Sequence, residues 1–137
     1  MADGDNNTQS MEDLFGPVIY SYTRAQAIED GVLVDLSELA PDVCRQHYKY
    51  HIACTAAVWA IIDQAVNNKR CMNDLKGVIH DMLWMSRVYK KNLSPSDILF
   101  QVKIVGAGRK SLFEFKMTCS GGDDGEPVLT ILMPNED

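Results

Sequence analysis

Four residues of the types that bind zinc lie close together near the middle of the chain. They are Cys44, His47, His51 and Cys54, in the pattern C-x2-H-x3-H-x2-C. Thiolates and imidazoles are ligands that zinc prefers, but one straight helix would spread these four over about 15 Å, too far for one ion. A zinc site would need a chain break near Tyr50. We expect instead two buried thiols and two partly exposed imidazoles, with no bound metal or other cofactor.

Nucleophilic catalysis would require a cysteine or serine beside a histidine and an orienting acid. Cys71 and His80 share one predicted helix but are separated by more than two turns, so they do not meet within it. The sequence contains no G-x-S-x-G motif and no phosphate-binding loop. The four cysteines include no C-x-x-C pair, which favours free thiols in a reducing compartment.

Acidic residues are concentrated in three segments of the chain. Residues 1–13 hold four acids and no base, residues 24–42 hold five acids and one base, and residues 123–137 hold five acids and no base. An acidic surface often serves solubility alone. Carboxylates on loops can also dock on the basic nucleic-acid channel of another protein. The candidate partner-binding residues are Glu29, Asp30, Asp35, Asp123, Asp124 and Glu126.

Composition excludes several classes of protein. The net charge is −6 and the pI is near 4.9, whereas a conventional nucleic-acid binder carries a surplus of bases. No stretch of about 18 apolar residues is present, so we expect no membrane span. The N-terminus lacks a basic region followed by an apolar one, which favours the cytoplasm. Residues 1–13 lack apolar anchors and predict a disordered tail.

Residues 17–92 predict one strand, a possible second strand and three helices. Residues 17–23 have strand composition. Residues 23–30 predict a two-turn helix capped by Thr23, and residues 32–37 predict a short strand or an extended loop. Two longer helices are predicted over residues 52–68 and 71–92, the second from apolar residues at three- and four-residue steps. Its last turn would hold Lys90 and Lys91, where cations suit the helix dipole.

The last third of the chain predicts strands. Residues 97–105 and 111–119 alternate apolar and polar side chains, and residues 127–134 form a mostly apolar run. Short loops between them indicate an antiparallel meander, whose apolar face the two central helices would cover. We therefore expect one α+β domain over residues 14–137, with an N-terminal strand and short helix and two central helices packed on a C-terminal three-stranded antiparallel meander.

One segment resembles the N-terminal motif of ADP-ribosyltransferase folds. In IYSYTRAQAIEDGVLV a strand and a polar residue precede a helix that ends at a glycine. The resemblance implies that Ser21 or Tyr22 contacts a nicotinamide dinucleotide, and that Glu114 or Glu126 acts on the ribose. The early His or Arg of those enzymes is missing here. The alternative is a strand, a capped helix and a glycine C-cap with no enzymatic role.

A broader resemblance covers most of residues 17–137. The segments IYSYTRAQAIEDGVLVDLS, TAAVW, DMLWMSR and GDDGEPVLTILMPNED resemble an uncharacterised small domain family carried by bacterial plasmids, integrative elements and phages. The segment CRQHYKYHI at residues 44–52 departs from that family. The resemblance implies a mobile-element setting and transfers no catalytic residue.

These observations together favour a non-enzymatic acidic protein-binding module. We expect an inhibitor of a host nucleic-acid-targeting defence complex, of the anti-CRISPR or anti-restriction type, that binds a protein partner and no nucleic acid directly. The alternatives are an ADP-ribosyltransferase-like enzyme and a plasmid maintenance accessory protein.

Overall fold

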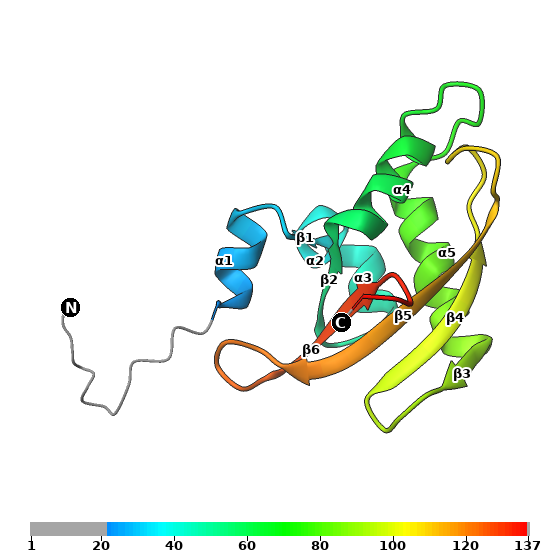
Figure 1. Ribbon diagram of the computed structural model, residues 1–137. Coiled ribbons are helices and arrows are strands. Elements are labelled where there is room, and N and C mark those ends of the chain that lie inside the picture. The colour runs from blue at the N-terminus through cyan, green and yellow to red at the C-terminus, as the bar shows by residue number, and fades with distance from the viewer. Residues whose placement is uncertain (1–21, 137) are drawn as a thin grey trace, which may run out of the picture.

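The computed structural model describes residues 22–136, which form five helices and a six-stranded sheet (Figure 1). The helices are α1 (Arg24–Glu29), α2 (Leu36–Leu39), α3 (Pro41–His47), α4 (Ala56–Val66) and α5 (Leu75–Val88). The strands are β1 (Leu33–Asp35), β2 (His51–Thr55), β3 (Lys90–Asn92), β4 (Asp97–Lys103), β5 (Leu112–Gly121) and β6 (Pro127–Leu132). Across the sheet their order is β1-β2-β6-β5-β4-β3. Strands β2 and β6 run parallel, and the other neighbours run antiparallel.

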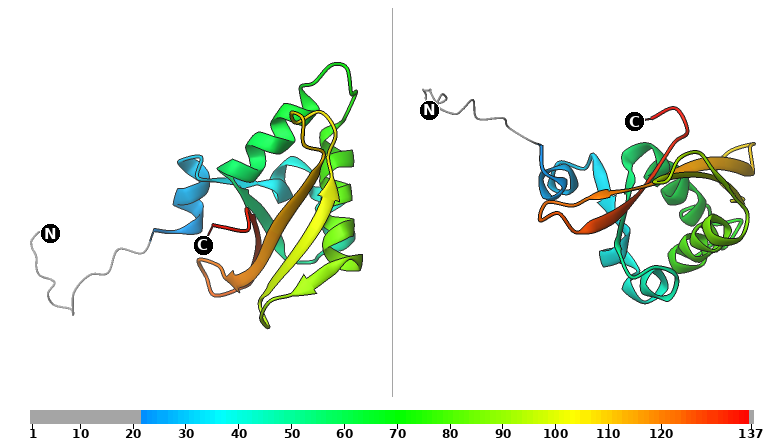
Figure 2. Two further views of the ribbon diagram at one scale, coloured as in Figure 1. Left: turned by 45° about the vertical axis from the view of Figure 1, so that its right-hand side comes forward. Right: turned by 90° about the horizontal axis from the view of Figure 1, so that it is seen from below.

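The main core lies between one face of the sheet and helices α2 to α5 (Figure 2). Phe100, Phe115 and Ile131 enter it from β4, β5 and β6, and Ile62 and Met82 enter it from α4 and α5. Helix α1 contacts the opposite face of the sheet, where Arg24 bonds to residues of β6. On the face that α1 contacts, the two halves of the sheet differ in cover: α1 lies beside β1 and β6, and within residues 22–136 no helix covers β4 and β3 on that face.

The predicted three-stranded meander is confirmed as β4, β5 and β6, but it is only half of the sheet. Alternation of buried and exposed residues in β4 and β5 matches the sequence pattern. The expectation of a three-strand sheet is wrong because β3 pairs with β4, and β2 and β1 extend the other edge.

The predicted helix over residues 52–68 is wrong at its start. Residues Ile52–Thr55 belong to β2, a central strand with three consecutive buried residues. A short apolar run does not distinguish a buried strand from a buried helix turn. Helix α4 begins only at Ala56. Thr55 caps it, because its side chain accepts a hydrogen bond from the Val58 amide at 3.4 Å.

The predicted helix over residues 71–92 is shorter at both ends. Asp74 caps α5 by accepting from the Gly77 amide at 3.2 Å. Lys90 and Lys91 are not in its last turn, because they form β3 opposite Phe100 and Leu99. The short helix predicted near residues 23–30 is confirmed as α1, and its capping box joins Thr23 and Gln26.

Some expectations fall on residues that the structure does not describe. The tail at residues 1–13 and nearly all of the strand predicted at 17–23 lie outside residues 22–136, so both stay predictions, as does the domain boundary at residue 14. No helix within the described part of the chain combines the length and apolar character needed to span a bilayer.

Candidate protein-interaction surfaces

The four residues of metal-ligand type lie in separate surroundings. Cys44 is buried in α3, where its thiol donates to the Leu36 carbonyl at 3.4 Å, and Cys54 is buried in β2. Burial raises the pKa of the Cys44 thiol to about 11 and that of Cys54 to about 12. Both thiols therefore stay protonated near neutral pH, which makes them poor nucleophiles and poor ligands.

The two histidines of the pattern have different partners. His47 Nε2 lies 2.9 Å from His80 Nδ1 on α5, and Arg87 donates to the other ring nitrogen of His47 at 3.1 Å. His51 Nε2 instead lies 2.8 Å from an Asp35 carboxylate oxygen. Within residues 22–136 no three His, Cys, Asp or Glu side chains are placed to share a metal ion. The expected two buried thiols and two partly exposed imidazoles are confirmed.

Among the described residues that the ADP-ribosyltransferase resemblance suggests, Tyr22 and Glu114 line different cavities. Ser21 lies outside the described residues. The Tyr22 hydroxyl donates to Asp30 at 2.6 Å and lines a cavity beside α1. Glu114 lines a different cavity, near β3, and Glu126 accepts a bond within its own loop.

The loop between β5 and β6 docks on the N-terminus of α1. The carboxylate of Asp123 accepts hydrogen bonds from the Arg24 amide at 2.8 Å and the Ala25 amide at 3.1 Å. These are first-turn amides that have no acceptor inside the helix, and a carboxylate there also suits the helix dipole. This contact joins two acidic segments that are 99 residues apart in the chain.

The side chain of Arg24 also holds α1 in place, through bonds to strand β6. Its guanidinium donates to the Thr130 hydroxyl and to the Leu129 carbonyl, both at 2.7 Å. Burial lowers the pKa of Arg24, while the carboxylates of Asp35, Asp123 and Glu126 oppose that shift. The Arg24 group is thus a cation set among several of the predicted binding acids.

Three more of the predicted acids, Asp30, Asp35 and Glu126, also have internal bonds. Asp30 accepts from Tyr22, Asp35 caps α2 by accepting from the Glu38 amide at 3.0 Å, and Glu126 accepts from the Asp124 amide at 3.0 Å. We call the six predicted residues the acidic end: Glu29, Asp30, Asp35, Asp123, Asp124 and Glu126. All of them except Asp35 are exposed. Whether they contact a partner stays a prediction.

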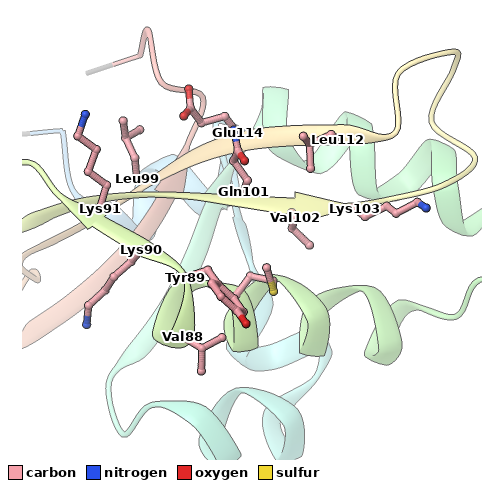
Figure 3. Close-up of a pocket in the computed structure, with 11 residues that line it drawn as sticks. Val88, Tyr89, Lys90, Lys91, Leu99, Gln101, Val102, Lys103, Leu112 and Glu114 are labelled. Atoms are coloured by element: carbon pink, nitrogen blue, oxygen red, sulfur yellow. The ribbon is translucent and has the colours of Figure 1, made fainter.

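A cavity of 740 Å³ lies at the opposite end of the sheet (Figure 3). Its lysines are Lys90 and Lys91 of β3 and Lys103 of β4, and Glu114 is the acid among its lining residues. We call it the basic edge groove. The side chains of Val88, Tyr89 and Leu112, which also line it, are 44%, 71% and 52% exposed.

Sequence reasoning missed the basic edge groove because it placed Lys90 and Lys91 in a helix. The available signal was a surplus of three bases over residues 63–91 in an otherwise acidic chain. That surplus did not indicate a groove, since the groove needs β4 and β5 beside the two lysines.

Comparison with known proteins gives one result. A protein-family model, described as a family of unknown function (DUF6573), matches residues 11–137. No curated protein and no solved structure matches the chain.

Proposed function

The chain belongs to this family of unknown function, and we propose that it is a non-enzymatic protein-binding module. In this proposal the acidic end docks on a basic surface of a partner protein. The observation that carries the proposal is the bond of Asp123 to the Arg24 and Ala25 amides. Because of that bond, acids from two distant segments share one surface.

Internal bonds support a binding role for these carboxylates as well as a structural one. Asp123, Asp30 and Glu126 are exposed, yet each is held by a hydrogen bond within the protein. A charged group that is already fixed loses little side-chain freedom when it binds. A fixed array of negative charge also steers association with a basic partner.

The sequence resemblance favours a particular partner. A chain that resembles mobile-element proteins and carries a net charge of −6 suits an inhibitor of a host nucleic-acid-targeting defence complex. The carboxylates would occupy the basic channel where that complex receives phosphates. The chain itself would bind the protein and not the nucleic acid.

The test starts from a partner captured from a bacterial host lysate and then purified. Glu29→Lys with Asp124→Lys reverses two exposed charges and spares the Asp123 bond. We expect at least a tenfold loss of affinity, about 1.4 kcal/mol. We also expect a DNA oligonucleotide to compete with the protein for the partner.

The matched control is Asp63→Lys with Asp81→Lys, which changes the net charge equally on the exposed surfaces of α4 and α5. It should leave the affinity nearly unchanged. Equal losses for the two pairs, or unchanged affinity for the Glu29 and Asp124 pair, would remove the acidic end from the binding surface. Failure of DNA to compete would contradict the proposed kind of partner.

A further inference from the structure

Part of the β4 edge is left without a neighbouring strand in the described chain. Strand β3 pairs only with residues Ile98–Phe100 of β4. Further along the chain, the carbonyls of Val105 and Gly106 accept hydrogen bonds from the side chains of Asn73 and Asn68 at 2.6 and 3.1 Å. Residues 101–103 lie between these two covered stretches and line the basic edge groove.

Some backbone polar groups of this open stretch face away from β5. The Ile104 amide donates to the Ser111 carbonyl at 2.8 Å, so the polar groups of Ile104 face the β5 side. Successive residues of an antiparallel strand direct their N–H and C=O groups to opposite edges. The N–H and C=O of Lys103 therefore face away from β5, toward the open edge. Such groups are a template for an added strand.

Apolar side chains lie on both sides of that edge. Figure 3 shows Leu99 and Leu112 on one side of the strands and Val88 and Tyr89 on the other, toward α5. Successive side chains of an extended segment also point to opposite faces. The groove therefore offers apolar contacts to both sets of side chains of a bound segment.

The charges around the basic edge groove favour an acidic bound segment. Lys90 and Lys91 project from opposite sides of β3, and Lys103 extends from the end of β4 (Figure 3). Three lysines against Glu114 make this groove locally basic in a chain whose net charge is −6. An acidic segment would meet opposite charges on either side of the edge, whereas a basic one would be repelled.

We propose that the basic edge groove binds an extended acidic segment of a partner protein by strand addition along residues 101–103. The backbone of the segment pairs with that of Lys103. Its carboxylates face Lys90, Lys91 and Lys103, and its apolar side chains contact Tyr89 and Leu112. This inference does not depend on the acidic end, which lies at the other end of the sheet.

The probe is a set of peptides selected on the full chain from a randomised display library, then synthesised with a fluorescent label. We expect the selected peptides to alternate Asp or Glu with apolar residues. N-methylation of alternate peptide amides should abolish binding to the unmodified protein, because it removes the backbone donors. In NMR spectra the Lys103 amide should shift and gain protection from exchange when the peptide binds.

Lys90→Glu with Lys103→Glu should weaken peptide binding at least tenfold, as measured by fluorescence anisotropy. Arg45→Glu with Lys69→Glu, an equal charge change away from the groove, should have little effect.

A selection that yields no acidic extended peptide would overturn the proposal. Unchanged binding of the N-methylated peptide, or equal effects of the two charge pairs, would overturn it as well. The Glu29 and Asp124 pair is expected to leave peptide binding unchanged, which separates this test from that of the acidic end.

Discussion

The charged groups at the two ends of the sheet differ in what they bond to. At the acidic end, Asp123 holds the first amides of α1, and Asp35 caps α2. At the basic edge groove, Lys90, Lys91 and Lys103 have no side-chain hydrogen bond or ion pair within residues 22–136. Asp123 and Asp35 thus contribute to the fold whether or not a partner is present. Because no described side chain bonds to these lysines, mutations at the two ends should have different consequences for stability.

The largest effect is expected where the acidic end is anchored. Arg24→Met keeps the apolar stem but removes the donors to the Leu129 carbonyl and to Thr130, which is buried. Leaving such acceptors without partners should lower the free energy of unfolding by about 2–3 kcal/mol. Urea denaturation measures it, with the exposed Arg45→Met as the control. Similar losses in both variants would mean that the Arg24 bonds contribute nothing specific.

A smaller effect is expected for the loop that docks on α1. Asp123→Ala removes the acceptor for two first-turn amides of α1 and should lower the free energy of unfolding by about 0.5–2 kcal/mol, the range found when a side-chain acceptor at a helix N-terminus is lost. Its neighbour Asp124 is exposed and supplies a matched control, since surface changes usually stay within about 0.5 kcal/mol. If Asp124→Ala were as destabilising as Asp123→Ala, the docking contact would not explain the loss.

A pH dependence of the free energy of unfolding is expected from His47, which belongs to neither the acidic end nor the basic edge groove. Burial lowers the pKa of His47, and nearby His80 and Arg87 lower it further. A lowered folded-state pKa means that the unfolded chain takes up the proton first as pH falls. The stability that the neutral His47 provides is therefore present above its ordinary pKa of about 6.5 and is lost as pH falls through the lower folded-state value.

Urea titrations between pH 7.5 and 5 test this effect. His47→Gln should flatten the part of the pH dependence that comes from His47. Charge changes at Lys90 and Lys103 should leave that part in place. A pH dependence that is identical in His47→Gln and the unmodified protein would assign the effect to other groups.

The smallest stability effect is expected at the basic edge groove. Lys90→Glu with Lys103→Glu alters two exposed side chains that have no bonded partner within the described residues. The change in the free energy of unfolding should stay within about 0.5 kcal/mol for each substitution. A much larger loss would show that these lysines support the fold and would remove the contrast between the two ends.

The parts of the fold that could be predicted from sequence are those that local patterns determine. Alternation in β4 and β5 predicted the meander, and the Thr23 cap predicted α1. Strand β2 was missed because Ile52, Ala53 and Cys54 are apolar on both faces, and because each of its residues pairs with a residue of β6 that lies 77 positions later in the chain. Pairing over that distance leaves no periodic signal in either segment.

The surfaces were predictable only in part. The sequence shows the segments in which acids are concentrated. It does not show that Asp123 bonds to the first turn of a helix 99 residues away. The acids singled out as binding residues therefore also have structural roles that no local pattern indicates. Strand β3 has three exposed residues and no alternation, so Lys90 and Lys91 were assigned to the preceding helix, and the groove could not be predicted.

Amide hydrogen exchange in the unbound protein tests the contrast most directly. First-turn amides of a helix ordinarily exchange quickly, but Asp123 should slow the Arg24 and Ala25 amides. The Lys103 amide, on the open edge, should exchange quickly although it lies within β4. We predict slow exchange at Arg24 and Ala25 and fast exchange at Lys103. Rapid exchange at Arg24 and Ala25 together with protection at Lys103 would contradict it.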